Sequence, residues 1–334
     1  MATLAEQMQG ERMARVALSM VAEPNDAATG RVLAQVGGIE TLRLVESDDP
    51  VPGLARADAL MWRERLSARI TPDLPNRVAE TQGGEFGTLV PADKEWPAGL
   101  DDLGERAPYL LWTRGATSFL TAALSDRVTI TGSRASTSYG AHVTGDLATG
   151  MADEERIVVA GGAYGIEGAA HRAVLAAGGQ TVAVLAGGLD RPYPAGHSDL
   201  LRRIGDVGLL VSELPPGAAP TRHRFIARNR LMAALSGATV IPEAGVRSGS
   251  MATVLTAREL GRGVGAVPGP VSSAASTGPN ELIKQRFASL ITQPSDMIAL
   301  LDADDPPKRG VTRAELGQEF GHRRPEPGAP GRSL

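Results

Sequence analysis

The sequence predicts an α/β fold with a doubly wound, mostly parallel sheet, preceded by a small helical domain. Two patterns carry this prediction. Apolar residues recur at helical spacing over residues 11–80. From residue 127 onward, short runs rich in β-branched residues alternate with amphipathic stretches. Those runs are almost continuously apolar, which is typical of parallel strands covered by helices on both faces. A doubly wound sheet is the simplest arrangement that satisfies both patterns.

The first domain is predicted to contain three short amphipathic helices. Apolar residues recur at helical spacing over 13–21 and again over 27–36, with the Pro24-Asn25-Asp26 turn between them. Gly37-Gly38 is expected to end the second helix, and a third helix begins at Ile39. This arrangement resembles SAM and helix-hairpin-helix domains, and it is shared by other small helical bundles.

A stretch rich in Pro, Gly and Asp separates the two domains. It includes residues 71–75, 88–90 and 96–100, and such a composition is typical of a transition between domains. The boundary is expected near residue 85, which gives domains over 1–84 and 85–301 and a tail over 302–334. The tail is expected to be largely disordered, apart from a short helix that begins near Thr312.

Strands and helices alternate in the second domain. The strands are expected at 128–131, 157–160, 181–185, 209–212, 239–241 and 264–267. The helices are expected at 139–151, 166–177, 198–204, 225–235 and 251–260. Open parallel sheets bind their ligands beyond the carboxyl ends of the strands. The loops that follow the strands are therefore the place to look for a site.

The composition excludes several kinds of site. The chain has 334 residues and no cysteine, so disulfides and cysteine-ligated metal centres are excluded. No apolar run reaches the roughly 18 residues of a membrane span. The first ten residues lack the features of a secretory signal, and a cytoplasmic protein is expected. No spacing of His, Asp and Glu indicates a metal site, and no cofactor is expected. Because the net charge is -4, any site for a polyanion must be a local basic patch.

The loops after the first two strands are predicted to bind phosphate. The first contains Gly132, Ser133 and Arg134 shortly before a helix, so that backbone N–H groups, hydroxyls and one cation can meet an anion. The second contains Gly162, Tyr164 and Gly165. Its glycines allow a close approach of the backbone to a ligand, but their spacing differs from the G-x-G-x-x-G pattern of dinucleotide sites.

The densest basic stretch follows the fourth strand and surrounds one aromatic side chain. It holds Arg224, Phe225, Arg228, Asn229 and Arg230. A single-stranded polynucleotide needs cations for its backbone and a flat face for its bases. Positions 224 and 228 are expected to share a helix face and to neutralise phosphates. Arg230 is expected to point elsewhere and to pair with an acidic residue such as Glu213.

The loop after the fifth strand is a further turn suited to anions. It contains Arg247, Ser248, Gly249 and Ser250 just before a helix. One glycine-rich loop usually serves only a tight turn, whereas several at one edge of a sheet indicate a phosphate-binding surface. Among the other ionisable groups, Glu167 is interpreted as a charge at a helix N-terminus and His171 as a packing residue. The sequence shows no nucleophile with a neighbouring base.

Seven motifs, in this order, resemble the DprA/Smf family (DNA-processing protein A). They are Thr131-Gly132-Ser133-Arg134 with Tyr139-Gly140, Gly165-Ile166-Glu167 with Ala169-Ala170-His171, Gly188-Leu189-Asp190 with Tyr193-Pro194, Ser212-Glu213 with Pro215-Pro216-Gly217, Phe225 with Arg228-Asn229-Arg230, Arg247-Ser248-Gly249-Ser250, and Val267-Pro268-Gly269-Pro270. The resemblance covers residues 88–290 and, more loosely, the N-terminal helices.

The resemblance implies a fold, a ligand and partners. Members of this family have an extended Rossmann-like fold that forms a homodimer, bind single-stranded DNA in a positively charged pocket, and help to load the recombinase RecA during natural transformation. The self-association surface would lie over residues 242–290. The positions that would hold DNA are Ser133, Arg134, Gly162, Gly165, Phe225, Arg228, Arg230, Ser248 and Ser250.

The chain departs from the family in two places. Tyr164 stands where the second loop commonly carries an arginine, so stacking on Tyr164 would replace one phosphate contact. Many members also end in a winged-helix domain, and the sequence after Pro307 is expected to be too short for one.

Two alternatives to a DNA-binding role remain open. Related Rossmann-like enzymes, the cytokinin-activating phosphoribohydrolases, hydrolyse nucleoside monophosphates with a Pro-Gly-Gly loop and a glutamate. The corresponding Pro242-Glu243-Ala244-Gly245 lacks the paired glycine, so a protein that is not an enzyme is favoured. A nucleotide-sensing module could use the same pocket. Binding that grows with oligonucleotide length would favour the DNA role over both.

Overall fold

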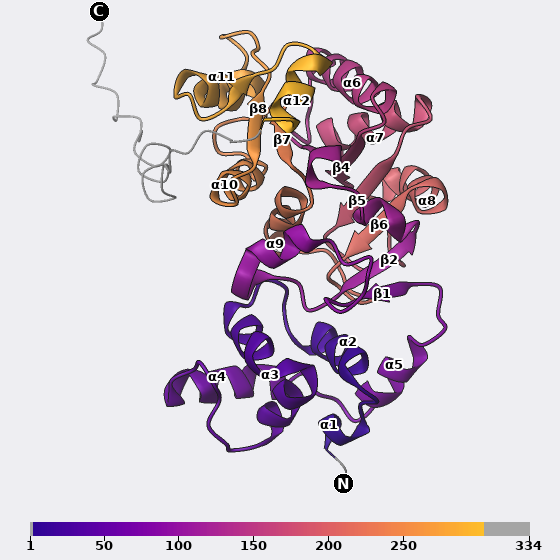
Figure 1. Ribbon diagram of the computed structural model, residues 1–334, viewed down its shortest axis with the longest axis vertical. Coiled ribbons are helices and arrows are strands. Elements are labelled where there is room, and N and C mark those ends of the chain that lie inside the picture. Colours follow the sequence, from indigo (N-terminus) through magenta and orange to yellow (C-terminus); the bar gives the residue numbers. More distant parts are fainter. Residues whose placement is uncertain (1–2, 304–334) are drawn as a thin grey trace, which may run out of the picture.

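The computed structural model describes residues 3–303, which form a helical region and an α/β domain (Figure 1). The helical region lies at one end of the molecule and contains α1 (Leu4–Gln7), α2 (Glu11–Val21), α3 (Ala27–Glu46), α4 (Arg56–Ser67) and α5 (Leu74–Glu80). Gly37 interrupts α3 with a φ of 76° and a ψ of 176°. The predicted break at Gly37-Gly38 is therefore confirmed. The expected tail helix near Thr312 lies outside the described residues.

The expectation of three helices in this region was too few, because α4 and α5 also belong to it. Helix α5 begins inside a Pro-rich stretch that we interpreted as a linker. Pro75 lies in the first turn of α5, where its missing N–H costs no intrahelical hydrogen bond. The bundle closes around side chains that include Leu18, Leu42 and Trp62, each almost fully buried. Helices α4 and α5 contribute to this core, so residues 56–80 are part of a folded unit.

One mixed sheet organises the α/β domain. Its strand order is β1-β2-β6-β5-β4-β3-β7-β8-β9. The strands are β1 (Gly87–Leu89), β2 (Leu111–Gly115), β3 (Arg127–Ile130), β4 (Ile157–Gly161), β5 (Thr181–Leu185), β6 (Leu209–Ser212), β7 (Ala238–Ile241), β8 (Gly263–Ala266) and β9 (Ser289–Leu290). The β1–β2 and β2–β6 pairs are antiparallel and the others are parallel. The predicted doubly wound, mostly parallel sheet is confirmed.

Three strands escaped the sequence analysis. β1 and β2 form the antiparallel edge, and β9 closes the opposite edge with only two residues. β1 lies in the stretch interpreted as a transition, and β2 stands among short 3₁₀ turns such as η1 (Ala98–Arg106) and η2 (Thr117–Leu120). Strands this short lack a clear period in the sequence. The edges of the sheet are therefore less predictable than its centre.

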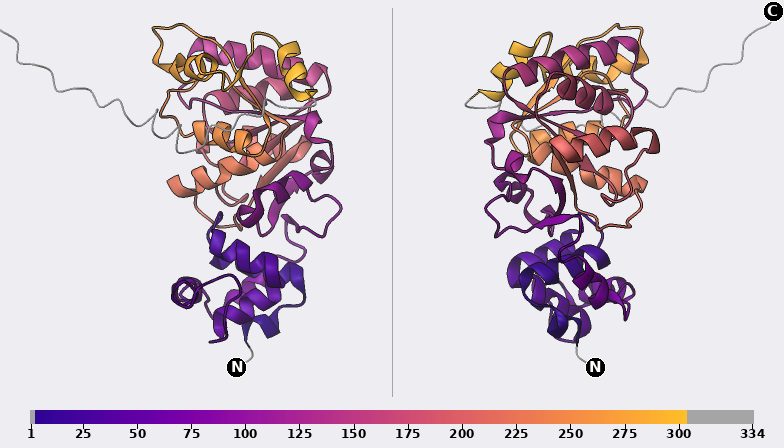
Figure 2. Two further views of the ribbon diagram at one scale, coloured as in Figure 1. Left: turned by 60° about the vertical axis from the view of Figure 1, so that its left-hand side comes forward. Right: turned by 90° about the vertical axis from the view of Figure 1, so that its right-hand side faces the viewer.

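Helices cover both faces of the sheet (Figure 2). The helices of this domain are α6 (Ser138–Asp153), α7 (Ile166–Ala176), α8 (Ser198–Val207), α9 (Arg222–Ala234), α10 (Met251–Glu259), α11 (Thr277–Lys284) and α12 (Pro294–Leu301). Alternate residues of the central strands supply the two cores. Val158 packs with α6 and α7, whereas Val159 packs with α9. The β3, β4 and β7 strands therefore end in loops that lie close to the start of α9.

The helical region is joined to the sheet by a shared apolar core. Tyr109, Leu110 and Trp112 belong to the same buried cluster as the core of the helical bundle and as Leu210 of β6. The Tyr109 hydroxyl donates to the Glu23 carbonyl over 3.0 Å, and Arg15 donates to the Tyr109 carbonyl over 2.9 Å. These contacts hold the end of α2 against the segment that leads into β2.

Gly165 is predicted to be required for the arrangement of the first two loops. Its φ is +74°, and a methyl group there would collide with the backbone carbonyls of Ser133 and Arg134. Gly165→Ala should therefore lower the free energy of unfolding by about 2 kcal/mol or more. Gly178→Ala is the matched control, because Gly178 has a φ of +73° but open space around it. Urea denaturation measures both variants, and an equal loss in the two would contradict the proposed backbone contact.

Candidate nucleic-acid interface

A cavity of about 1080 Å³, here called the central cavity, lies beyond the carboxyl ends of the central strands. It is lined by the loops after β3, β4 and β7, by the first half of α9, and by parts of the segments 193–220 and 274–277. Ten of the predicted site residues line it: Gly132, Ser133, Arg134, Phe225, Arg228, Asn229, Arg247, Ser248, Gly249 and Ser250. The fold thus brings together three loops that are far apart in the sequence.

Three arginines supply positive charge to the central cavity. Arg134, Arg222 and Arg247 line it and are exposed. Within residues 3–303, no ion pair uses any of these three guanidinium groups. They come from three different loops or helix starts. The cavity therefore presents unneutralised positive charge from several sides, which suits a chain of phosphates.

Phe225 and Arg134 form a stacked pair at the wall of the cavity. The Arg134 guanidinium lies over the Phe225 ring, 4.4 Å from its centroid. The Tyr193 ring approaches Phe225 edge-on at 5.8 Å between centroids. Phe225 is therefore covered in part by a cation, and Arg134 itself is exposed. A guanidinium plane can stack on a base as an aromatic ring does.

Arg228 lies beneath this pair in a buried network. Its Nη1 donates to the Val184 carbonyl over 2.7 Å, and its Nη2 lies 3.5 Å from the Glu167 carboxylate. Glu167 also accepts from the Thr131 hydroxyl over 2.9 Å and from the Ala163 N–H over 3.0 Å. Burial alone would raise the pKa of Glu167, but Arg228 and these two donors hold it below its ordinary value. Glu167, in the first turn of α7, is therefore a buried carboxylate that stays charged and binds Arg228 and the Thr131 hydroxyl.

The predicted pairing of Arg230 with Glu213 is confirmed. Both guanidinium Nη atoms lie 2.5 Å from the carboxylate oxygens, and both side chains are buried. Arg230 also donates to the Arg106 carbonyl over 2.7 Å. Neither Arg230 nor Glu213 lines the central cavity. The pair instead fixes α9 against the end of β6.

The expected placement of Arg224 needs correction. Positions 224 and 228 were expected to share a DNA-facing side of the helix, but Arg224 does not line the central cavity. Its guanidinium donates to both Glu23 carboxylate oxygens over 2.9 and 3.0 Å, and to the Ala219 carbonyl over 2.8 Å. Arg69 binds the same carboxylate. The charge of Arg224 is therefore neutralised by the helical region.

The expected anion site at the start of α6 also needs correction. The Glu243 carboxylate accepts from the Thr137 N–H over 2.9 Å and from the Thr137 hydroxyl over 2.6 Å. A Cβ at Gly140 would overlap the same carboxylate. A phosphate cannot occupy the place of this buried carboxylate, because the space is filled and the charges repel. Ser133 and Arg134 remain at the cavity wall, but the helix N-terminus behind them is already capped.

Only a small part of the second loop lines the central cavity. Of its residues, Ala163 reaches the cavity, whereas Gly162, Tyr164 and Gly165 do not. Tyr164 is 47% exposed, packs edge-on against His197 at 4.6 Å, and accepts at its hydroxyl from the Gly196 N–H over 3.2 Å. Gly165 packs instead against the backbone of the first loop at Ser133 and Arg134, and Gly162 packs against Leu185, Tyr193 and Leu201.

The loop after β7 reaches the cavity as expected. The Ser248 and Ser250 hydroxyls are hydrogen-bonded to each other over 2.8 Å. Asn229 of α9 donates to the Gly249 carbonyl over 2.9 Å, which ties this loop to the basic helix. Arg247 extends from the same loop into the exposed part of the cavity. The loop and α9 therefore form one wall.

Some cavity residues were not predicted from the sequence. Arg222 lies in the basic stretch that we identified but was not singled out, although it precedes Phe225 by three residues in α9. Tyr193 lies in the proline-containing loop after β5 and was quoted only as part of a family motif. Thr277 comes from a segment without any chemical signal in the sequence. Only the tertiary fold brings Thr277 to the site.

The remaining candidate groups have structural partners. His171 is buried, bonded to the Thr181 hydroxyl over 2.7 Å, and burial lowers its pKa to about 4. The interpretation of His171 as a packing residue is confirmed. Over residues 3–303, no group of His, Asp and Glu is arranged to hold a metal ion. In the same range, no helix is both long enough and apolar enough to cross a membrane.

Comparisons with known proteins agree on one family. The family model described as DNA recombination-mediator protein A matches residues 87–302. A DprA relative from Mycobacterium tuberculosis is 42% identical over 316 residues, which is 90% of this chain and 79% of the relative. DNA processing protein DprA from Streptococcus pneumoniae is 38% identical over 215 residues, covering 64% of this chain and 74% of its own.

Two solved structures are similar over most of their length. The X-ray structure of the Streptococcus pneumoniae DprA has a TM-score of 0.73 and 31% identity, and the match covers 87% of this chain and 98% of that chain. DprA from Helicobacter pylori, described for its single-stranded DNA binding mode, has a TM-score of 0.59 and 30% identity, and the match covers 66% of this chain and 97% of that chain.

The contact between Glu23 and Arg224 is predicted to make the joint between the two regions sensitive to acid. Hydrogen bonding from Arg224 lowers the pKa of Glu23, and Arg69 adds to this effect. A lowered carboxyl pKa stabilises the folded state above the unfolded pKa, near 4.3, and the gain is lost as the pH falls through the folded pKa. Glu23→Gln should cost about 1 kcal/mol at pH 7 and progressively less below pH 4.

Thermal unfolding from pH 7 to pH 3 measures this effect. Glu40→Gln is the control, because the Glu40–Arg43 pair is exposed and lies within α3. A Glu23→Gln penalty that stays constant down to pH 3 would show that the charge of Glu23 does not stabilise this joint.

Proposed function

The chain belongs to the DNA recombination-mediator protein A family, and we propose that it binds single-stranded DNA in the central cavity without enzymatic turnover. The observation that carries this proposal is the set of Arg134, Arg222 and Arg247 around one cavity, none of which has an ion-pair partner within residues 3–303, with the Arg134–Phe225 contact among them. Phosphates would lie against the arginines and a base against the stack. The Helicobacter pylori relative, described with a single-stranded DNA binding mode, supports the same ligand.

The shape of the cavity favours single strands over duplexes. The cationic groups line a recess rather than a raised ridge or an exposed helix, and Phe225 lies within it. A base in a duplex is already stacked and cannot turn toward this wall without the cost of unpairing. Direct readout of base edges is not expected, because the contacts are to phosphates and to the face of a base. We therefore propose binding with little sequence preference.

A hydrolytic role is less well supported. In Pro242-Glu243-Ala244-Gly245, the glutamate that would serve as the base is 1% exposed and is bonded through both oxygens to Thr137. It faces the start of α6, and a water molecule could not reach it for activation without loss of this cap. We propose that Glu243 is structural. The nucleotide-sensing alternative is tested by comparing mononucleotides with oligonucleotides.

Family membership further suggests partners. We propose that the chain acts in the cytoplasm as a homodimer and helps to load RecA onto single-stranded DNA during natural transformation. The segment 242–290 is proposed as the self-association surface. In support, it contains Val271, which is 95% exposed, and Leu290, which is 52% exposed on the edge strand β9. Exposed apolar residues beside an edge strand are common at subunit contacts.

The DNA proposal predicts that substitutions of cavity arginines weaken DNA binding, whereas substitution of the buried Arg228 destabilises the fold. Arg134→Ala and Arg247→Ala should each reduce the slope of log affinity against log salt by about 0.7, because each removes one phosphate contact to a single strand. Both variants should keep the wild-type melting temperature, since neither guanidinium has an ion-pair partner among the described residues. Arg228→Met should instead destabilise the fold by about 3 kcal/mol or more, because it leaves Glu167 as an unpaired buried charge.

Fluorescence anisotropy with a labelled oligothymidylate, over a range of salt concentrations, measures these slopes. Arg202→Ala is the control, because Arg202 is an exposed arginine of α8 paired with Asp199 and outside the cavity. Unchanged slopes for both Arg134→Ala and Arg247→Ala would place the DNA elsewhere. Equal affinity for a blunt duplex of the same length would contradict the single-strand preference.

A further inference from the structure

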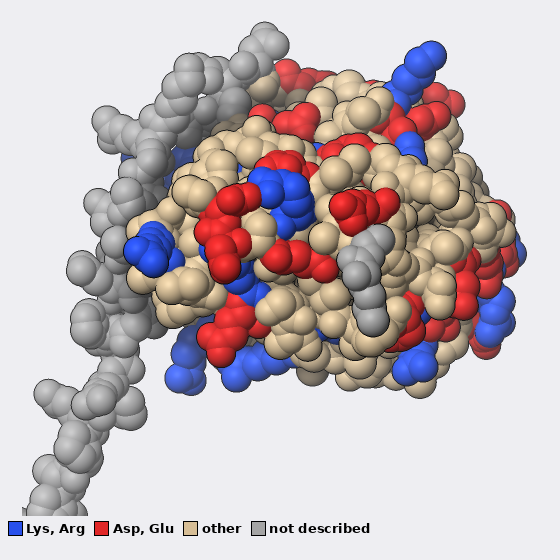
Figure 3. All heavy atoms as spheres, turned by 90° about the horizontal axis from the view of Figure 1, so that it is seen from below, with Lys and Arg blue, Asp and Glu red and all other residues tan. Residues whose placement is uncertain are grey.

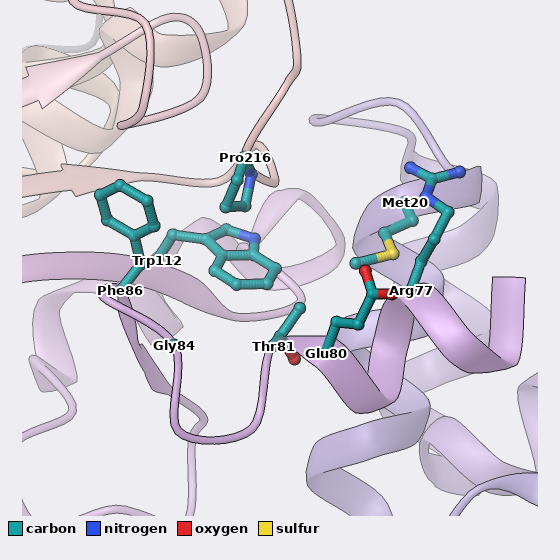
Figure 4. Close-up of a pocket in the computed structure, with 8 residues that line it drawn as sticks. All are labelled: Met20, Arg77, Glu80, Thr81, Gly84, Phe86, Trp112 and Pro216. Atoms are coloured by element: carbon teal, nitrogen blue, oxygen red, sulfur yellow. The ribbon is translucent and has the colours of Figure 1, made fainter.

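A second cavity, of about 280 Å³, lies where the helical region meets the antiparallel edge of the sheet (Figure 4). It is called the junction cavity here. Its lining residues come from both regions: Met20, Arg77, Glu80, Thr81, Gly84, Phe86, Trp112 and Pro216. Helix α5 forms one side, and β2 with the loop after β6 forms the other. The volume is near the lower limit for small-molecule pockets, so it suits one ring system rather than a large ligand.

Trp112 leaves a polar group without a partner at this cavity. The side chain is 1% exposed, and its indole Nε1 has no hydrogen-bond acceptor among the described residues. Figure 4 shows the indole of Trp112 between Pro216 on one side and Met20 with Glu80 on the other. A buried N–H without an acceptor is costly, and most such donors in folded proteins are satisfied. The other tryptophans follow that rule, since Trp62 donates to Thr29 and Trp96 to Asp101.

Helix α5 adds one cation and one anion to the rim. Arg77 and Glu80 lie on adjacent turns and both extend toward Met20 in Figure 4. Over residues 3–303, neither side chain takes part in an ion pair with another group. Their charges cancel, in contrast to the excess of arginine at the central cavity. The junction cavity therefore suits an uncharged ligand that carries both hydrogen-bond donors and acceptors.

The walls indicate that the ligand has flat apolar faces. Phe86 and Trp112 are aromatic, Pro216 presents its ring, and the flexible thioether of Met20 adapts to aromatic surfaces. Around these walls stand two kinds of donor, the Trp112 N–H and the Arg77 guanidinium, and one acceptor, the Glu80 carboxylate. A nucleobase has this combination: apolar faces, ring nitrogen and carbonyl acceptors, and amino or imino donors.

We infer that the junction cavity binds a nucleobase between Met20 and Trp112, with its polar edge toward Arg77 and Glu80. The base can be free or can belong to a bound strand. The segment after β6 connects the two cavities, because Pro216 lines the junction cavity whereas Pro220 and Thr221 line the central cavity. The site is separate from the proposed DNA cavity, and its occupancy does not require the proposed function.

Free nucleosides provide the direct test with the full chain. Adenosine, guanosine, cytidine and thymidine are titrated while tryptophan fluorescence and saturation-transfer NMR are recorded. At least one nucleoside should bind saturably in the millimolar range or tighter and change the fluorescence. The fluorescence change should persist in Trp96→Phe and disappear in Trp112→Phe, provided that circular dichroism shows both variants to be folded.

Exposed rim variants keep the test independent of folding. Arg77→Gln and Glu80→Gln should each weaken nucleoside binding by about three- to tenfold, because each removes a charge-assisted hydrogen bond. Arg56→Gln is the control, since Arg56 is exposed on α4 and lies outside the junction cavity. Saturable binding that both rim variants leave unchanged would overturn the inference, as would the absence of saturable binding for all four nucleosides and for an oligonucleotide at this site.

An oligonucleotide arm distinguishes the two sources of the base. If the base comes from a bound strand, an oligothymidylate should compete with the nucleoside, and Arg77→Gln should weaken oligonucleotide binding. If the base is free, nucleoside binding should be unchanged by saturating oligonucleotide. In Arg134→Ala, weaker DNA binding with a lower salt slope and intact nucleoside binding would report on the central cavity alone. Failure of the DNA proposal and failure of the nucleobase inference are therefore separate results.

Discussion

The geometry of the central cavity depends on the buried pair of Arg228 and Glu167. Arg228 joins α9 to the end of β5 through the Val184 carbonyl, and Glu167 joins the start of α7 to Thr131 at the end of β3. The pair thus ties together the strand ends from which the cavity loops leave. Neither charge is stable alone at 5% side-chain exposure. This buried pair holds the backbone segments that carry the exposed arginines and Phe225, so these side chains have fixed positions in the cavity.

The helix α9 shows how similar residues in one short stretch divide between support and binding. Arg222 lines the cavity, Arg224 joins the helical region through Glu23, Arg228 supports the strand ends, and Arg230 pairs with Glu213. The sequence analysis identified the stretch and predicted the Arg230–Glu213 pair. It could not place Arg224, because Glu23 is 201 positions away in the chain and only the docking of the helical region brings it near. Charge density predicts where a basic site lies but does not show which of its cations are neutralised.

The same limit applies to the glycine-rich loops and to the sheet. The central strands and their helices were predictable because their apolar runs are long and regular, whereas β1, β2 and β9 are short and lie at the edges. The loops after β3 and β7 both line the central cavity. Donors of the predicted anion-binding loops are partly used by the protein itself, since Glu243 accepts from the Thr137 N–H at the start of α6 and Glu167 accepts from the Ala163 N–H in the loop after β4. A loop pattern that suits a phosphate also suits an internal carboxylate, and the two differ only in tertiary contacts.

The central cavity is proposed as the path of a single DNA strand, and photocrosslinking tests this most directly. An oligothymidylate with photoreactive bases is bound to the full chain and irradiated, and the crosslinked peptides are identified by mass spectrometry. Crosslinks are expected in the segments that line the cavity, above all at Tyr193 and Phe225 and within residues 245–250. Excess unlabelled single strand, but not duplex, should abolish them. Crosslinks confined to α3, α4 or α8, with none at the cavity, would contradict the account.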